Sequence, residues 1–324
     1  MRKGVLRFAI VVAFPLYVLS LATASQAHAA YPEADKIIDM YHHAAPGTAP
    51  DLFLRTCADI LNRKGIVKPK IQVQTRQGGS SAVALNYLLA KAGDPYVMMA
   101  WTTAPILAML RGTTNLKLQN CSWLGTFIED PNVLIVNYKS PYRTLADLLA
   151  DAKANPKKVS VGINSIGGSE HLQAIRLERA AGVKFNITAF EFAPTMVIGG
   201  HIDVGFGNTA ETAGHVKSKR ARALAAVSPR RLPYFKDIPT LMEQGVNTSF
   251  TQYRGLFGGP DFPVEATKFW DDAFTKMVKT PEFIEFAKKA DVVINYKTSE
   301  ETKAFLEGYI QELEKDLKYM QANK

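Results

Sequence analysis

The chain has 324 residues and a formal net charge of +9. This mild basicity suits an anionic partner. The densest basic cluster comprises Lys217, Lys219, Arg220 and Arg222, without interleaved aromatic residues or a nucleic-acid-binding motif. We therefore expect no nucleic-acid partner.

The N-terminus has the features of a secretory signal peptide. It begins with Met1-Arg2-Lys3, continues with an apolar run from Phe8 to Leu21, and reaches an A-x-A site that ends at Ala29. The run is shorter than the ~20 apolar residues that span a bilayer, which disfavours the alternative of an uncleaved anchor. We predict cleavage of residues 1–29 and a periplasmic location for the rest.

Strands and helices are predicted to alternate along the remaining chain. Strands are expected at Lys36–Tyr41, Lys70–Gln77, Tyr96–Trp101, Trp123–Phe127, Asn132–Tyr138, Val159–Ile163, Ile187–Phe190, Ile202–Phe206, Ala221–Val227 and Tyr253–Gly258. Helices are expected at Asp51–Lys64, Ser81–Ala92, from Thr102-Thr103 onward, and at Thr144–Ala154, Ser169–Ala181, Val264–Val278, Pro281–Ala290 and Ser299–Gln321. This alternation indicates parallel sheets covered by helices, in an α/β protein.

Small residues collect where a predicted strand leads into a helix. These turns are Ala44–Asp51, Gly78–Ser81, Thr102–Thr103, Ser165–Ser169 and Asn208–Thr209. In an open α/β sheet such turns lie together at the carboxyl ends of the strands, where ligands bind. Each also presents the unpaired N–H groups of a helix start. We therefore predict an anion site that needs neither a metal nor a fixed cation.

The stretch SVGINSIGGSEH resembles a phosphate-binding loop without its cation. Gly162, Gly167 and Ser169 match the spacing of that motif, but Gly168 stands where a lysine is required. The backbone donors remain, and Ser169 is the expected helix cap. The loop is interpreted either as a cradle for a small anion such as a carboxylate or as a plain helix cap.

No catalytic, metal or cofactor site is predicted. Ser169 and His171 are two residues apart on a helix and point in different directions, and GGSEH is not a nucleophile elbow. His42 and His43 have no cysteine or carboxylate at ligand spacing. Asp51 is interpreted as an acid in the first turn of a helix.

Two sets of side chains leave alternatives open. Cys57 and Cys121 either form a disulfide in the exported chain or are buried thiols. The aromatic residues Trp101, Phe127 and Tyr253 either line a ligand cleft or belong to the core.

An ordered set of segments is similar to one known family. The set is Tyr31-Pro32, APGTAPD at Ala45–Asp51, QGGS at Gln77–Ser80, PNVLIVN at Pro131–Asn137, GGSEHL at Gly167–Leu172, GGHIDV at Gly199–Val204, RALA at Arg222–Ala225 and DIPT at Asp237–Thr240. It resembles the extracytoplasmic solute-binding proteins of tripartite tricarboxylate transporters, the TctC or Bug family, from about Tyr31 to the C-terminal helix.

The resemblance implies a two-lobed periplasmic-binding-protein fold of type II-like topology. Each lobe is expected to be a mixed sheet flanked by helices, with the ligand cleft between the lobes. Lobe 1 is expected at residues 31–127 plus 249–324, and lobe 2 at residues 128–248. Implied partners are a small organic acid and the membrane permease subunits, for a protein that is a monomer and not an enzyme.

The family comparison and the turns together give the expected ligand-binding residues. They are Ala45, Pro46, Gly47, Thr48 and Asp51, then Gly78, Gly79 and Ser80, then Thr102 and Thr103, then Ser165, Ile166, Gly167, Gly168 and Ser169, and finally Asn208 and Thr209. One departure is Thr48-Ala49-Pro50 before Asp51, where the family's first loop usually has a run of glycines, and Pro50 lacks an N–H donor.

The leading hypothesis is a receptor for a di- or tricarboxylate, with an aromatic carboxylate as the main rival ligand. The alternatives from other classes are a secreted α/β hydrolase that uses Ser169 and a sensor that presents its closed form to a signalling partner.

Overall fold

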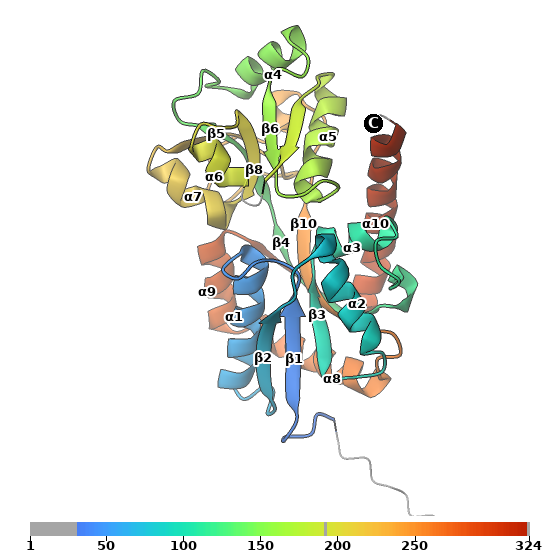
Figure 1. The fold of residues 1–324 in the computed structure, drawn as a ribbon. Coiled ribbons are helices and arrows are strands. Elements are labelled where there is room, and N and C mark those ends of the chain that lie inside the picture. Colours follow the sequence, from blue (N-terminus) through green and yellow to red (C-terminus); the bar gives the residue numbers. More distant parts are fainter. Residues whose placement is uncertain (1–30, 191–192, 323–324) are drawn as a thin grey trace, which may run out of the picture. The chain divides into compact units, whose positions relative to one another are not determined.

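The structure is a computed structural model that describes residues 31–190 and 193–322. The predicted signal peptide at residues 1–29 lies outside these residues. The described strands form two sheets (Figure 1). The chain passes from the first sheet to the second at Pro131 and returns after the last strand of the second sheet.

The first sheet is mixed. Its strands, in spatial order, are β11 (Val293–Lys297), β4 (Ser122–Asp130), β10 (Gln252–Gly258), β3 (Val97–Trp101), β1 (Ile37–His42) and β2 (Lys70–Thr75). Strand β1 pairs in parallel with β2 and β3, but β10 is antiparallel to β3 and β4. Because β10 enters from the second sheet, it runs against the strands that lead toward that sheet.

The second sheet is mixed for the same reason. Its order is β7 (Asn186–Ala189), β6 (Ser160–Ile163), β8 (Val204–Asn208), β5 (Asn132–Asn137) and β9 (Ala221–Ala226). Strand β6 is parallel to β7 and β8, whereas β5, which enters from the first sheet, is antiparallel to β8 and β9. The alternation of strands and helices indicated parallel sheets, whereas both sheets are mixed, as the family resemblance implied.

Helices cover both sheets. They are α1 (Ala49–Arg63), α2 (Ala82–Ala90), α3 (Thr103–Leu110), α4 (Leu145–Ala154), α5 (Ser169–Ala181), α6 (Ala193–Ile198), α7 (Thr209–Lys217), α8 (Val264–Met277), α9 (Pro281–Ala290) and α10 (Ser299–Ala322). Short 3₁₀ turns lie at Gly79–Ser81, Leu118–Asn120 and Met242–Gln244. Thr144 caps α4 in a capping box with Asp147, as its position before the helix predicts. Within the described residues, each helix is too short or too polar to span a bilayer.

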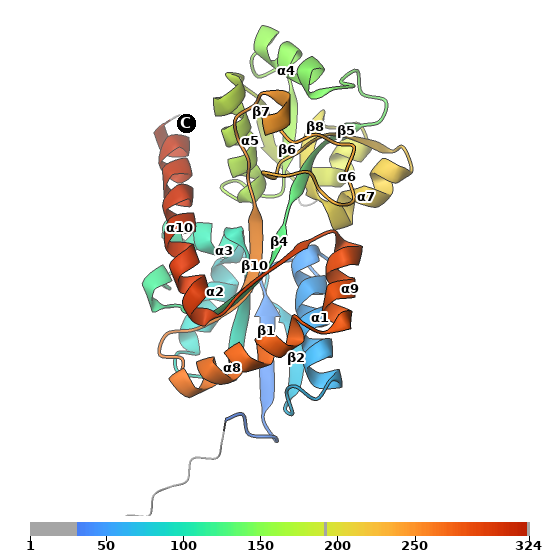
Figure 2. The same ribbon diagram turned by 180° about the vertical axis from the view of Figure 1, so that it is seen from behind.

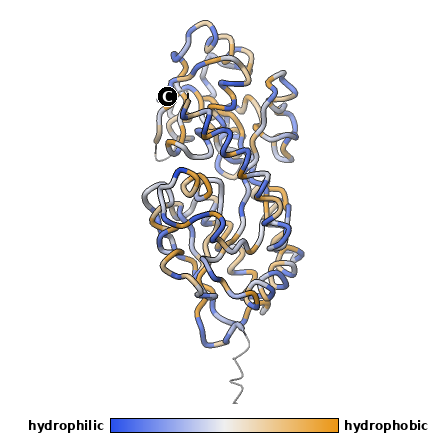
Figure 3. Tube along the Cα trace, turned by 90° about the vertical axis from the view of Figure 1, so that its right-hand side faces the viewer, coloured by the Kyte–Doolittle hydropathy of each residue, from blue (hydrophilic) through white to orange (hydrophobic). Residues whose placement is uncertain are grey.

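Alternating strand residues divide the first sheet between two apolar layers. Met40 and Met98 face a core formed with α1, α8 and α9, and α8 and α9 lie on the near side of the sheet in Figure 2. Their neighbours Tyr41 and Met99 face the layer formed with α2, α3 and α10. In the first layer Trp270 stacks on Phe274 with a centroid distance of 4.9 Å. Apolar stretches (orange) and polar stretches (blue) are interspersed along the chain trace (Figure 3).

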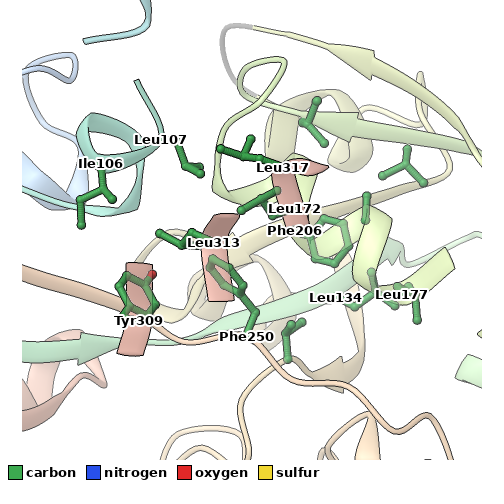
Figure 4. Close-up of a cluster of buried hydrophobic side chains, with 14 of the residues drawn as sticks. Ile106, Leu107, Leu134, Leu172, Leu177, Phe206, Phe250, Tyr309, Leu313 and Leu317 are labelled. Atoms are coloured by element: carbon green, nitrogen blue, oxygen red, sulfur yellow. The ribbon is translucent and has the colours of Figure 1, made fainter. Parts of the chain in front are cut away.

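Helix α10 packs against helices that flank both sheets. Its Leu313 lies in the apolar cluster that also contains Leu107 of α3 and Leu172 of α5 (Figure 4). Beside this cluster, Arg176 of α5 donates from Nε to Asp316 of α10 at 2.6 Å. The C-terminal helix therefore connects α5 to the elements of the first sheet.

The sequence misplaced a few elements. Strand β11 was not predicted, because VINYK is a short segment whose residues are all half-buried. Strand β8 begins two residues later than expected, after a turn in which Gly200 has φ +77°. The lobe boundaries stay a prediction, with the strands of the second sheet lying between Asn132 and Ala226.

Candidate functional site

A cavity of about 540 Å³ lies where loops from the two sheets meet. Five of its lining residues are the N-caps of described α-helices. They are Thr48 of α1, Ser81 of α2, Thr102 of α3, Gly168 of α5 and Asn208 of α7. The first helical N–H groups therefore start at one cavity, where they provide donors and positive dipole ends for an anion.

The first loop is held by a buried carboxylate. Asp51 accepts from the backbone N–H of Gly47 at 2.8 Å and from Nε of Arg55 at 2.9 Å, and it is bonded to Nε2 of His42 at 2.8 Å. Burial raises the pKa of Asp51, but these hydrogen bonds outweigh burial and leave the pKa below its ordinary value. Asp51 is therefore bonded within the loop and does not line the cavity, whereas Thr48 of the same loop does.

The second loop has an unusual backbone. Gly78, Gly79, Ser80 and Ser81 have φ values of 124°, 56°, 50° and 83°. The left-handed region costs a residue with a side chain about 1–2 kcal/mol. Such conformations concentrate at functional sites, and three of these residues, Gly78, Ser80 and Ser81, line the cavity.

The loop between β6 and α5 is fixed from two sides. The N–H of Gly167 donates to Nδ1 of His171 at 2.9 Å, and the Gly167 carbonyl accepts from Nη1 of Arg111. Gly167 has φ +73°, and a Cβ there would collide with the Arg111 guanidinium. The expected cap Ser169 is instead the first residue of α5, because the extended residue before it is Gly168.

Two more helix starts complete the cavity wall. The hydroxyl of Thr102 accepts from the N–H of Ala104 at 3.3 Å and contacts Nε2 of His43 at 3.2 Å. Burial lowers the pKa of His43 to about 3, so this imidazole is neutral near pH 7. Asn208 caps α7 by accepting from the N–H of Glu211 at 3.1 Å.

The cavity also contains charged side chains that the sequence analysis did not assign to it. They are Arg111, Glu170, Glu211 and Arg254. Arg254 of β10 is 4% exposed, and its Nη2 pairs with the buried Asp130. Burial, together with Asp130 and Glu170, raises the pKa of Glu211 to about 7. The lining therefore contains both arginines and acids, and an anion site that needs no fixed cation stays a prediction.

The predicted ligand-binding residues divide into two groups. Nine line the cavity, namely Thr48, Gly78, Ser80, Thr102, Ser165, Gly167, Gly168, Ser169 and Asn208. Eight do not line it, namely Ala45, Pro46, Gly47, Asp51, Gly79, Thr103, Ile166 and Thr209. Pro50, the departure from the family pattern, does line the cavity, within the first turn of α1.

Further lining residues were missed. They are His43, Ala44, Ser81, Ala104, Asn132, Asn164, Gly207 and Gln252, besides Pro50 and the four charged residues. Most of them adjoin a predicted turn, so a wider window around each turn finds them. Arg254 carries its own signal, because it is a charged residue in the apolar strand segment YRGLFG.

The open alternatives are resolved in part. Cys57 and Cys121 are both free thiols, so the possible disulfide is not formed. Among the described lining residues, Trp101, Phe127 and Tyr253 are absent. Trp101 is instead buried in the core, where its Nε1 donates to the carbonyl of Gly125 at 3.1 Å.

The two mixed sheets, their helices and the cavity lined by helix starts define a two-lobed solute-binding fold of the periplasmic-binding-protein type. Residues 55–320 match the family described as tripartite tricarboxylate transporter family receptor, TctC. The chain belongs to this family.

Individual relatives agree with the family and the fold. The chain is 26% identical over 300 residues to the UPF0065 protein in the gbd 5′ region of Cupriavidus necator, covering 89% of this chain and 90% of that protein. A Rhodopseudomonas palustris protein solved with adipate has a TM-score of 0.80 at 18% identity, covering 87% of this chain and 96% of its own. MatC of the same species, solved with malate, has a TM-score of 0.76 at 14% identity, covering 86% and 96%.

Proposed function

We propose that this protein is a periplasmic receptor that captures a small organic carboxylate, in the di- or tricarboxylate class, and delivers it to a tripartite transporter permease. The observation that carries this proposal is the convergence of five helix N-caps on one cavity. The adipate and malate bound by two proteins of the same fold support the carboxylate class.

The ligand would be bound mainly by the backbone. We propose that the lining residues of the predicted set hold it, with the loops Gly78–Ser81 and Ser165–Ser169 approaching from opposite sheets. A hydrogen bond to a charged group contributes about 1.5–3 kcal/mol net. Six such bonds give a gross gain of about 9–18 kcal/mol before the costs of association and ordering, compared with the ~8 kcal/mol net of a micromolar complex. The cavity volume of about 540 Å³ is in the range of small-molecule sites.

Ligand binding would shift the two lobes toward a closed arrangement. A ligand changes such an equilibrium only if it binds one arrangement more tightly. A carboxylate held by amides from both sheets meets this condition. We propose that the permease subunits recognise the closed form.

We further propose that the protein binds its ligand without transforming it. Ser169 begins α5, and Nδ1 of His171 already accepts from the N–H of Gly167 at 2.9 Å. A serine hydrolase requires its histidine to activate the serine hydroxyl. The unsubstituted protein should therefore convert no substrate, and Ser169→Ala should only weaken ligand binding.

A thermal-shift screen of the purified protein tests the proposed function. The panel contains citrate, succinate, malate, adipate and benzoate, with glucose and putrescine as uncharged and cationic controls. At least one acid should raise the melting temperature with concentration, by a stabilisation of about 2.7 kcal/mol at 100 times its Kd. Stabilisation by glucose or putrescine alone, with every acid inert, would contradict the carboxylate assignment.

A further inference from the structure

A group of basic side chains lies at the end of α7 that is remote from the ligand cavity. Helix α7 begins after its cap Asn208, which lines the cavity, and ends at Lys217. The helix has 9 residues, so its two ends lie about 14 Å apart. The chain that follows carries Lys219, Arg220 and Arg222. The basic cluster of the sequence is therefore separate from the candidate ligand site.

A second cavity, of about 590 Å³, lies beside this cluster. Its lining comes from the loop that follows β5 and from the loops that precede β8 and β9. The cations of the lining are Lys139, Lys219 and Arg220. Together with Lys217 and Arg222 they form what we call the α7 basic surface. All of them are exposed except Arg222, which is half-buried.

The loop that carries Lys139 is held in place by Arg222. The guanidinium of Arg222 donates from Nη2 to the carbonyl of Tyr138 at 2.9 Å and from Nη1 to the carbonyl of Tyr142 at 3.1 Å. The same guanidinium lies 4.9 Å from the centroid of the Tyr138 ring. In addition, the N–H of Tyr138 donates to the carbonyl of Arg220 at 3.1 Å. The backbone segments that carry Lys139 and Arg220 are thus fixed side by side, which lowers the cost of ordering them on binding.

The positive charges of the α7 basic surface are not neutralised by neighbouring acids. In the part of the chain that the structure describes, none of its five side chains forms an ion pair. Asp203, an acid of the cavity lining, accepts instead from the N–H and the hydroxyl of Ser160 at 2.9 and 2.6 Å. Burial and the charge of Arg220 hold the pKa of His215 in α7 below its ordinary value, which agrees with a positive potential at this surface.

We propose that the α7 basic surface binds the headgroups of anionic phospholipids, so that the protein associates reversibly with a membrane surface. This inference goes beyond the capture of a ligand and does not depend on which ligand is bound. The headgroup phosphate supplies the negative charge that the surface lacks. Close to an anionic membrane, each lysine or arginine increases the affinity about fivefold.

The composition of the α7 basic surface favours a lipid surface over an acidic protein segment. Lysine is depleted from protein–protein interfaces, but it provides Lys139, Lys217 and Lys219 here. Clusters of about four to eight lysines and arginines are typical of proteins that bind anionic membranes. The surface also includes the ring of Tyr138, which is 38% exposed. Tyrosine is enriched at the boundary between membrane and water, because one end of its side chain is apolar and the other is polar.

Cosedimentation of the purified protein with lipid vesicles tests the proposal. Vesicles of equal parts phosphatidylglycerol and phosphatidylcholine should bind the protein at about 0.1 M salt, whereas vesicles of phosphatidylcholine alone should not. An increase to about 1 M salt shortens the Debye length from about 10 to about 3 Å and should release the protein from the anionic vesicles.

Two double variants show whether this surface is responsible. Lys219→Gln combined with Arg220→Gln should weaken binding to the anionic vesicles about 25-fold, or about fivefold for each cation. The matched control combines Lys68→Gln with Lys70→Gln, which removes the same charge from exposed lysines at the start of β2. The control should bind the vesicles as the parent protein does. Both double variants should retain the melting temperature of the parent protein and its thermal shift with a carboxylate ligand.

The outcomes separate this inference from the proposed function. Failure to bind the anionic vesicles, or equal binding to both vesicle types, would overturn the inference. Equal weakening in the two double variants would also overturn it, because the net charge of the protein would then explain the binding. Binding of polyglutamate without binding of vesicles would replace the lipid by an acidic protein segment. The carboxylate receptor would stand in each of these cases, since it is tested by the thermal-shift screen.

Discussion

Replacement of Asp51 by asparagine tests how the first loop of the cavity is built. Asp51 is 3% exposed, and its two oxygens are bonded to Gly47, Arg55 and His42. Asparagine has one acceptor oxygen, so its amide group would face at least one of these donors. Because a buried charge-assisted network is broken, Asp51→Asn should cost about 2–4 kcal/mol.

Thermal unfolding at pH 7 measures this cost. For a protein of this size, about 3 kcal/mol corresponds to a decrease of about 5 °C in the melting temperature. The pKa of Asp51 is below its ordinary value, so its contribution is complete above about pH 4 and is lost as the pH falls through the folded-state pKa.

The matched control is Asp59→Asn on the same helix. Asp59 pairs with Arg63 at 3.1 Å, but the two side chains are 58% and 62% exposed. An exposed pair of this kind contributes about 0.2–1 kcal/mol at most. If Asp51→Asn were as mild as Asp59→Asn, the description of Asp51 as the group that holds the first loop would be refuted.

Three further predictions concern other parts of the chain. Gly167→Ala should weaken carboxylate binding about tenfold, as measured by titration, because it strains a left-handed residue of the cavity loop. The control is Gly182→Ala at the C-terminal end of α5. Gly182 is also left-handed but lies outside the cavity lining, so this substitution should lower stability and leave binding unchanged. Burial raises the pKa of Asp291 to about 6, so ionisation of this carboxyl group destabilises the fold as the pH rises from about 4 to 6. Asp291→Asn should therefore raise the melting temperature at pH 7.5 but not at pH 4.5. An equal change at both pH values would contradict this. Because Cys57 and Cys121 are free thiols, dithiothreitol should leave the melting temperature unchanged. Because burial raises the pKa of both thiols, a thiol reagent should modify them rapidly only in denaturant. Fast labelling of the native protein would contradict this prediction.

The elements and the position of the site could be predicted because local signals agree with the fold. Ser169–Ala181 and Pro281–Ala290 were predicted with the bounds that the structure has, since each begins after a loop or a capping threonine and carries an apolar face. The strand directions could not be predicted from alternation alone. They depend on where β10 and β5 cross between the sheets, which is a property of the whole chain.

The charges of the cavity were the main feature that the sequence did not reveal. An acid after a helix cap, such as Glu170 or Glu211, has the ordinary explanation of a favourable helix dipole. Only the arrangement of the two sheets brings both acids to the same cavity as Arg254. Conversely, Asp51 was expected at the ligand, but the bond from Gly47 turns its carboxylate toward the loop backbone.

A crystal structure of the protein with its most stabilising acid tests the central claim most directly. The account predicts a ligand carboxylate inside the cavity, with its oxygens within hydrogen-bond distance of backbone N–H groups at the starts of α2, α3 or α5. A ligand held outside this cavity, or held in it through a metal ion without contact to those amides, would contradict the account.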